Sequence, residues 1–339
     1  MKYKNTELHN IYDLIYSKEL DGHIISRVPG KTRKKINPRA QNRVMEPAGS
    51  EIRFICPAGK IKLTISCPRE PGQLVPFFGT FMARDKYTIS GKTVIEIEYP
   101  ERMKTLKNQY CSSLPFHPSV WRLKLRGTEM FVLHNIEGEG IAPPADSLLP
   151  EKCLLTYGTS ITHGAAATLP HLSYAAQTAR RLKYDLLNFG VGGSAFCEPA
   201  FTDFMAGLKT WDLATLCLSV NMLEEFSVKE FIKRAGYMIK KMSDNPKRHV
   251  FCISILPFFR DFGIIPDKKD LSCSAGDYRL ALHEITEKLS RKNVHFISGN
   301  SLLEEIDGLS TDLIHPSDYG MIQIGEKLTQ QITAIMKAG

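Results

Sequence analysis

The second half of the chain contains a serine in a context that suits nucleophilic catalysis. Ser160 lies in the stretch Thr156-Tyr157-Gly158-Thr159-Ser160-Ile161-Thr162-His163-Gly164, directly after the apolar run Cys153-Leu154-Leu155. This pattern predicts a strand, a glycine-bounded turn and then a helix. The turn would present the serine at the carboxyl end of a strand, where open α/β sheets bind their ligands. The alternative is a serine that only caps the helix of an ordinary βα loop.

An aspartate and a histidine near the end of the chain could activate this serine. Asp312 and His315 lie in the segment Thr311-Asp312-Leu313-Ile314-His315-Pro316. At this spacing both side chains fold onto one side of a single turn, so the carboxylate can hold one imidazole nitrogen while the other faces a serine. A serine hydroxyl needs such a base to become a nucleophile. Taken alone, the pair also fits a capped loop before a helix.

Two further segments could stabilise the oxyanion of a tetrahedral intermediate, which needs hydrogen-bond donors already aimed at it. Gly193 lies in the glycine-rich run Asn188-Phe189-Gly190-Val191-Gly192-Gly193-Ser194, where a backbone amide can approach a ligand closely. Asn221 follows the apolar run 213–218 and carries a side-chain amide. Each feature has an ordinary explanation, a tight turn or a helix cap. Their joint placement after strands of one sheet favours a site.

The elements that would position these residues alternate between strands and helices from Cys153 onward. We expect strands at 152–157, 184–189, 213–219, 249–255 and 294–298, with amphipathic helices between them and a last helix after Pro316. Ser227 and Glu230 form a capping-box pattern at the start of one helix. Five strands alternating with helices predict a parallel, doubly wound sheet with helices on both faces, whose loops after the strands gather at one edge.

The first half of the chain predicts a different architecture. Short β-branched or alternating runs recur about every ten residues from about 45 to 135, separated by turn residues, and no helical pattern of useful length interrupts them. This spacing is typical of an antiparallel β-sandwich. A Pro- and Gly-rich segment at 138–144 ends the pattern. We therefore expect two domains, a β-sandwich over 1–145 and an α/β domain over 151–339. Phe77, Phe78, Phe81, Tyr110, His117 and Trp121 are candidates for a substrate-facing rim, although core positions suit most of them better.

Composition limits the class of protein. The chain has 339 residues, of which 43% are hydrophobic and 24% charged, as in soluble globular proteins. No signal-peptide core follows Met1 and no run is long enough to span a membrane, so we expect a cytoplasmic protein. The eight cysteines lack CxxC spacing and most lie in apolar runs, which indicates reduced core residues. His283-Glu284 begins like a zinc motif, but Glu287 occupies the position of the second histidine, so we expect no metal or cofactor.

The net charge of +8 belongs entirely to the first half. Residues 1–150 hold 23 Lys and Arg against 15 Asp and Glu, whereas residues 151–339 hold 21 of each. The densest cluster is Lys31-Thr32-Arg33-Lys34-Lys35, followed by Arg39 and Arg43. Such a cluster can neutralise nucleic-acid phosphates. A solvated loop is the favoured interpretation, because no aromatic side chains lie between the basic ones to stack on bases. We expect neither nucleic-acid nor membrane partners.

The four segments together resemble the SGNH, or GDSL, hydrolase family. Gly158-Thr159-Ser160-Ile161-Thr162, Gly193, Asn221 and Asp312-Leu313-Ile314-His315-Pro316 are similar to the family's four blocks, in the family's order, and the likeness covers about 151–339. The whole chain is similar to a two-domain subgroup with a leading β-sandwich, which includes esterases and a polyketide-modifying acyltransferase. Thr159 stands where the family usually has an aspartate that is not the triad acid, which leaves the hydrogen bonds of that turn in question.

The resemblance implies a fold, a set of residue roles and an activity. The fold would be a flavodoxin-like five-stranded sheet preceded by a jelly-roll-like sandwich. Ser160 would be the nucleophile, His315 the general base and acid, and Asp312 the residue that orients His315. The amides of Ser160 and Gly193 and the Asn221 side chain would form the oxyanion hole. The expected activity is hydrolysis of a carboxylic ester through an acyl-serine intermediate.

The substrate and two alternative functions stay open at this point. The family suggests a short acyl group, such as acetyl, on a carbohydrate or small metabolite. An acyltransferase could use the same three residues while excluding water. A non-catalytic protein could instead bind an anionic partner through its basic first half. The oligomeric state is not indicated by the sequence.

Overall fold

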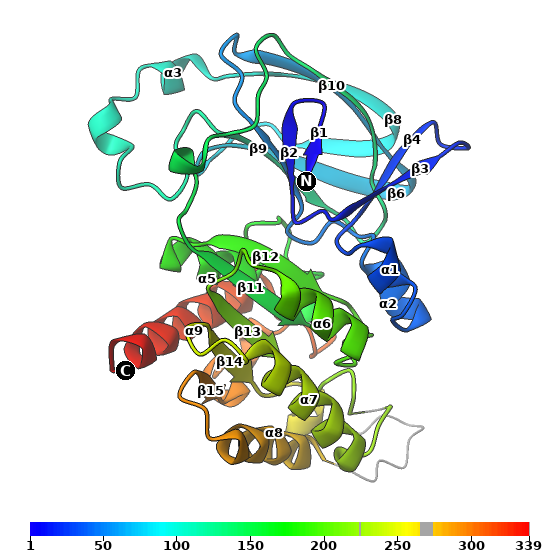
Figure 1. Ribbon diagram of the computed structural model, residues 1–339, viewed down its shortest axis with the longest axis vertical. Coiled ribbons are helices and arrows are strands. Elements are labelled where there is room, and N and C mark those ends of the chain that lie inside the picture. Colours follow the sequence, from blue (N-terminus) through cyan, green and yellow to red (C-terminus); the bar gives the residue numbers. More distant parts are fainter. Residues whose placement is uncertain (224, 265–273, 339) are drawn as a thin grey trace. The chain divides into compact units, whose positions relative to one another are not determined.

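The computed structural model describes residues 1–223, 225–264 and 274–338. These residues form two compact units (Figure 1). One, which we call the β-rich unit, comprises Met1–Gly30, Asn42–Lys152 and Lys183–Asp185. The other, which we call the α/β unit, comprises Lys31–Gln41, Cys153–Leu182 and the described residues of Leu186–Gly339. The expected division at 145–151 stays a prediction, and the short segments that the two units exchange are a feature the sequence pattern did not indicate.

The α/β unit is built on five parallel strands in the order β12-β11-β13-β14-β15. Every strand overlaps one expected from the sequence, which confirms the five-stranded parallel sheet. Their apolar runs are buried along almost their whole length, as is usual for strands covered on both faces. The strands are β11 (Cys153–Gly158), β12 (Asp185–Gly190), β13 (Leu213–Cys217), β14 (His249–Ile253) and β15 (Val294–Ile297).

Helices cover both faces of this sheet. The chain moves from β11 to β12 in one direction and then returns across β11 to β13, β14 and β15, so right-handed connections place α5 on one face and α6, α7 and α8 on the other (Figure 1). α9 packs on α5. The helices of this unit are α4 (Ser160–His163), α5 (Tyr174–Leu182), α6 (Pro199–Gly207), α7 (Val228–Met242), α8 (Ala275–Leu289) and α9 (Asp318–Ala338).

Local sequence explains where α7 begins. Ser227 is its N-cap, and the Ser227 side chain accepts a hydrogen bond from the Glu230 amide, as expected. The Glu230 carboxylate, by contrast, accepts from Arg234 one turn further on. One half of the expected capping box is therefore replaced by an i,i+4 ion pair.

The β-rich unit is antiparallel throughout, which confirms the expected β-rich domain. Its strands form one curled sheet in the order β1-β2-β5-β9-β6-β10-β4-β3, and β7 and β8 pair with β6 off this path. The 19-residue β6 pairs with β8 on both sides of a register shift at Cys67/Gly72, and it also pairs with β10 before this shift and with β9 after it. The β-rich unit is therefore built on one curled sheet and not on two separate sheets.

The elements of the β-rich unit and the helices near its first segment have the following bounds. The strands are β1 (Lys2–Tyr3), β2 (Thr6–His9), β3 (Asp13–Ser17), β4 (Gly22–Ser26), β5 (Glu51–Phe54), β6 (Lys60–Phe78), β7 (Phe81–Met82), β8 (Tyr87–Glu98), β9 (Trp121–Arg126) and β10 (Val132–Glu137). The helices are α1 (Gly30–Arg33), α2 (Pro38–Arg43) and α3 (Glu101–Lys104). Short 3-10 turns lie at 108–110 and 146–148 in the β-rich unit, and at 259–262, 299–301 and 306–308 in the α/β unit.

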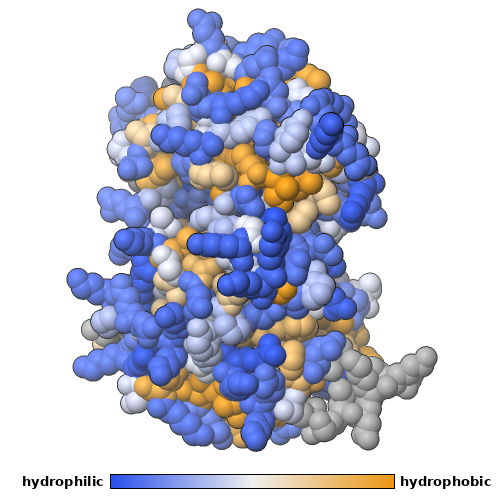
Figure 2. All heavy atoms as spheres, turned by 45° about the vertical axis from the view of Figure 1, so that its right-hand side comes forward, coloured by the Kyte–Doolittle hydropathy of each residue, from blue (hydrophilic) through white to orange (hydrophobic). Residues whose placement is uncertain are grey.

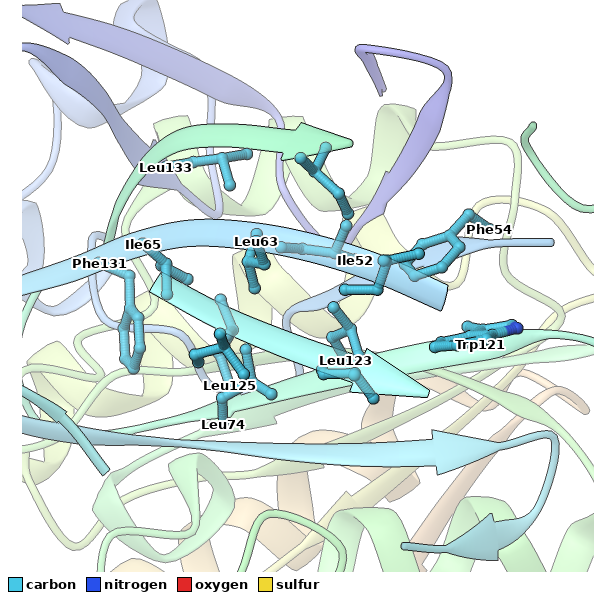
Figure 3. Close-up of a cluster of buried hydrophobic side chains, with 14 of the residues drawn as sticks. Ile52, Phe54, Leu63, Ile65, Leu74, Trp121, Leu123, Leu125, Phe131 and Leu133 are labelled. Carbon is cyan, nitrogen blue, oxygen red and sulfur yellow. The ribbon is translucent and has the colours of Figure 1, made fainter. Parts of the chain in front are cut away.

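Alternating apolar residues of these strands form the core of the β-rich unit. Figure 3 labels several of them, including Phe54 and Trp121, whose rings stack at a centroid distance of 5.4 Å. Phe77, Phe78 and Trp121, which were candidates for a substrate rim, are 6%, 2% and 1% exposed and belong to the interior. Phe81 and Tyr110 are exposed.

A buried ionic cluster lies within the β-rich unit. Arg53 is fully buried and donates to both Asp185 oxygens at 2.7 Å and to Glu51 at 2.8 Å. Arg122 donates to both Glu51 oxygens at 2.7 and 2.8 Å. Burial alone would raise the pKa values of Glu51 and Asp185, but the arginines hold the pKa of each carboxyl well below its usual range. The cluster is therefore charged at neutral pH and depends on its pairing.

The described cysteines are buried and the face drawn in Figure 2 is mostly hydrophilic, as the composition indicates. Seven of the eight cysteines lie in the described part of the chain, where all of them are buried, and Cys273 lies outside it. On the face drawn in Figure 2, hydrophilic residues predominate and apolar residues form separate patches. Among the described residues, every helix is too short or too polar to cross a membrane.

Candidate active site

Ser160 occupies the first position of the one-turn helix α4, directly after β11. Thr159 is the N-cap, in an extended conformation, and its side chain accepts a hydrogen bond from the Ile161 amide at 3.4 Å. The Thr159 hydroxyl thus caps the first turn of α4, at the position where the family usually has an aspartate. Gly164 ends the helix with φ +86°, a left-handed conformation that favours glycine. The serine is held on a tight strand-to-helix turn, as the sequence predicted.

The neighbouring strands fix this turn tightly. A Cβ on Gly158 would lie 2.2 Å from the Thr162 hydroxyl and 2.8 Å from the Cys217 carbonyl oxygen, so only glycine fits. From β12, the Asn188 side chain donates to the Thr162 carbonyl oxygen at 2.7 Å. Asn188 is a supporting residue that the sequence analysis did not single out, because only its partner 26 residues away gives it this role.

His315 and Asp312 reach Ser160 from the loop before α9. Ser160 Oγ lies 2.7 Å from His315 Nε2, and His315 Nδ1 lies 2.7 Å from Asp312 Oδ2. The structure therefore brings Ser160 into contact with His315, 155 positions further along the chain, and His315 into contact with Asp312. Because the carboxylate can only accept, its geometry assigns the proton of a neutral imidazole to Nδ1 and leaves the Nε2 lone pair facing the serine.

The second oxygen of Asp312 is held by the backbone. Asp312 Oδ1 accepts hydrogen bonds at 2.9 Å from the Ser310 hydroxyl and from the amides of Ile314 and His315. Partial burial opposes ionisation, but these bonds and the one from the His315 ring lower the pKa of Asp312 far below its usual range. The Asp312 carboxyl group is therefore ionised near neutral pH, and its hydrogen bonds fix its orientation.

The expected oxyanion donors lie on the two loops next to Ser160. The Val191 amide donates to the Gly158 carbonyl oxygen at 2.8 Å, which ties the loop after β12 to the end of β11. The Ala195 amide donates to Asn221 Oδ1 at 3.3 Å, which orients the Asn221 side chain and leaves its Nδ2 group available. Gly193 has φ +65° in a turn closed by a bond from Ser194 N–H to Val191 O. Within the described residues, the amides of Ser160 and Gly193 have no acceptor.

A small apolar pocket lies beside the segments that carry Ser160, Asn221 and His315. Its walls come from the loops after β11, β13 and β14 and from the segment that carries His315. Three of its residues, Ile161, Val220 and Ile314, are direct neighbours in sequence of Ser160, Asn221 and His315. The apolar side chains that line it include Ile161, Leu218, Val220, Ile255, Phe258 and Ile314.

The basic segment 31–41 belongs to this same unit. Asn37 binds Glu198, the N-cap of α6, through its amide and its side chain, and it also donates to the Ser194 carbonyl oxygen at 3.2 Å. Arg39 Nη1 donates to the Gly193 carbonyl oxygen at 2.8 Å. The sequence analysis treated this segment as a solvated loop. Lys31, Lys34 and Lys35 are indeed exposed, but Arg39 contacts an expected oxyanion residue.

The α/β unit is thus a doubly wound sheet that carries a serine, a histidine and an aspartate, hydrogen-bonded in series, at its carboxyl edge. A model of the GDSL-like lipase/acylhydrolase family matches residues 151–333, and the chain belongs to this family. The enzyme class expected from the sequence, an SGNH/GDSL-type carboxylic ester hydrolase, is thereby confirmed.

Solved structures with the same fold cover both units. A salicylyl-acyltransferase, SsfX3, from a tetracycline biosynthetic pathway has a TM-score of 0.79 at 17% identity, over 98% of this chain and 95% of that one. A family two carbohydrate esterase from Cellvibrio japonicus has a TM-score of 0.61 at 14% identity, over 86% and 90%. A carbohydrate esterase family 2 enzyme from Corynascus thermopiles has a TM-score of 0.60 at 15% identity, over 89% and 98%. No curated protein matches the chain.

Proposed function

We propose that the protein is a serine esterase that cleaves a carboxylic ester through an acyl-serine intermediate. The observation that carries the proposal is the hydrogen-bonded series from Ser160 Oγ through His315 to Asp312 Oδ2, with 2.7 Å at each step. This geometry supplies both a nucleophile and a base within hydrogen-bond reach, with the base oriented by a third group.

The reaction follows from the positions of these atoms. Ser160 Oγ attacks the ester carbonyl carbon while His315 Nε2 accepts the hydroxyl proton, and Asp312 stabilises the imidazolium without taking its proton. The negative charge that forms on the carbonyl oxygen is stabilised by the amides of Ser160 and Gly193 and by Asn221 Nδ2. The intermediate collapses when His315 protonates the departing alkoxide, so the alcohol leaves and the acyl group stays on Ser160.

A second cycle releases the acyl group. Water attacks the acyl-serine carbonyl while His315 Nε2 takes its proton, and the proton then returns to Ser160 Oγ as the carboxylic acid departs. The acyl group we propose is short and apolar, because the pocket lined by Thr159 and Ile161, the neighbours of Ser160 in the chain, is small and its other walls are mostly aliphatic and aromatic side chains. A carbohydrate or small metabolite supplies the alcohol, in keeping with the names of the carbohydrate esterases of similar fold.

A fluorophosphonate probe tests the nucleophile directly. We expect intact-mass analysis to show one probe adduct on the wild-type protein and on Ser112→Ala, a control that removes an exposed serine of the β-rich unit. Ser160→Ala should show no adduct and should lose nearly all ester hydrolysis. Labelling of folded Ser160→Ala, or turnover close to that of the wild type, would contradict the assignment.

A second candidate function is acyl transfer to an alcohol other than water. It is favoured by the likeness over both units to the structure named as a salicylyl-acyltransferase. Both reactions share the acyl-serine, so they differ only in what attacks it. If an added acceptor alcohol outcompetes water and forms a new ester, transfer is the activity. If the free carboxylic acid forms at the same rate with and without acceptor alcohols, the activity is hydrolysis.

A further inference from the structure

The guanidinium of Arg39 presents unused hydrogen-bond donors beside the candidate oxyanion loop. Its one hydrogen bond to the described residues, from Nη1 to the Gly193 carbonyl oxygen, engages one of five N–H groups. Arg39 is exposed and forms no ion pair within the part of the chain that the structure describes. An exposed guanidinium that is held at one corner keeps further donors with which it can bind a planar or tetrahedral oxyanion.

The segment that carries Arg39 is uniformly basic and is held in place. Residues 31–41 contain five Lys and Arg and no Asp or Glu. The bonds from Asn37 to Glu198 and to the Ser194 carbonyl oxygen fix the segment to the α/β unit, two residues from Arg39. A fixed cluster of one charge raises the local concentration of ions of the opposite charge, so the segment attracts anions toward the site.

The sheet order places Arg39 and the apolar pocket on opposite sides of the nucleophile. Gly193, which Arg39 contacts, follows β12, whereas the pocket is lined from the loops after β13 and β14. Ser160 follows β11, which lies between β12 and β13. An ester bound at Ser160 therefore has an apolar environment on one side and an exposed guanidinium on the other.

We propose that the protein prefers esters whose alcohol portion carries a carboxylate or phosphate group, and that Arg39 binds this anion. The apolar pocket takes the acyl group, because a charged acyl chain would lose its hydration there without a partner. The departing alcohol then lies on the solvent-exposed side, within reach of Arg39. This inference rests on the proposed esterase function and names the substrate class for the same site.

Matched aryl esters test the inference. Acetyl esters of 4-hydroxybenzoate and of hydroxyphenyl phosphate carry the anion on the alcohol, and the acetyl ester of 4-hydroxybenzamide is the neutral match. We expect the wild type to favour each anionic ester over the neutral one by roughly tenfold in kcat/KM, the low end for a charge-assisted hydrogen bond because Arg39 is exposed. The preference should reside in KM and should shrink as NaCl is added.

Variants separate binding of the anion from general electrostatics. Arg39→Gln should abolish the preference, and Arg39→Lys should keep part of it, because lysine retains the charge but not the fork of donors. The matched control is Arg180→Gln, which removes one exposed arginine charge from α5 and should keep the full preference. Because the ratio of anionic to neutral ester is compared, any effect of Arg39 on the Gly193 loop cancels.

Three results would overturn the inference. The first is an equal ratio in the wild type and Arg39→Gln. The second is a preference that appears only with the anion on the acyl side, as in phenyl succinate compared with phenyl butyrate. The third is no hydrolysis of any of these esters by the wild type, which would overturn the proposed esterase function as well. An active wild type whose ratio is insensitive to Arg39 contradicts this inference alone.

Discussion

Replacing Asp312 by asparagine should reverse the tautomer of His315. Asp312 Oδ1 accepts from one hydroxyl and two backbone amides, so the asparagine must place its carbonyl oxygen there, since an NH₂ group would face those amide donors. The NH₂ group is then turned to His315 Nδ1, which must accept. The imidazole proton moves to Nε2, and the atom 2.7 Å from Ser160 Oγ can no longer take a proton.

The expected loss is large although the substitution changes one atom. A triad whose histidine is held in the wrong tautomer loses about 10⁴ in kcat, which corresponds to about 5.4 kcal/mol of transition-state stabilisation. The assay is ester hydrolysis by purified protein, with thermal unfolding as the check on folding. Asp307→Asn, which changes an exposed aspartate nearby in sequence, serves as the control and should retain wild-type kcat. A folded Asp312→Asn protein within tenfold of the wild type would refute the role of Asp312 as the residue that orients His315.

Two other predictions concern the oxyanion hole and the buried ionic cluster. Asn221→Ala should lower kcat by about 10²–10³ with little change in melting temperature, and a loss of less than tenfold would remove its amide from the set of donors. Arg53→Met leaves the buried carboxylates of Asp185 and Glu51 short of a partner, so urea titration should show a loss of about 3–5 kcal/mol. The pKa values of these carboxyls are lowered in the folded protein, so their pairing stabilises the fold above the unfolded values of about 4 and is lost as the pH falls. Wild-type stability should therefore drop more steeply below about pH 4 than that of Arg53→Met, and parallel curves would contradict this account.

The sequence was most informative where local pattern and topology agree. Each parallel strand is a short buried apolar run bounded by turn residues, and the residues after such strands must meet at one sheet edge. This is why Ser160, Asn221 and His315 could be assigned to one site from positions far apart in the chain. The Ser160–His315 and His315–Asp312 distances agree with that expectation, while the catalytic roles stay predictions.

Features that depend on pairing between distant segments were not indicated by the sequence. The strands β1 to β4 are two to five residues long, too short for a periodic signal, and they are defined by partners elsewhere in the β-rich unit. Arg39 looked like one basic residue among several, because its contact with Gly193 lies 154 positions away. Asn37 and Glu198 likewise give no local sign of each other at a separation of 161.

The exchange of segments between the two units has a consequence for modularity. Because residues 31–41 belong to the α/β unit while the residues on both sides of them belong to the β-rich unit, no single cut of the chain yields two complete pieces. A fragment that starts at 151 would retain the three triad residues but lack Asn37 and Arg39, and Glu198 would lose both bonds from Asn37. The leading β-rich half therefore cannot be exchanged between enzymes like an independent binding module, since part of the second unit is encoded within it.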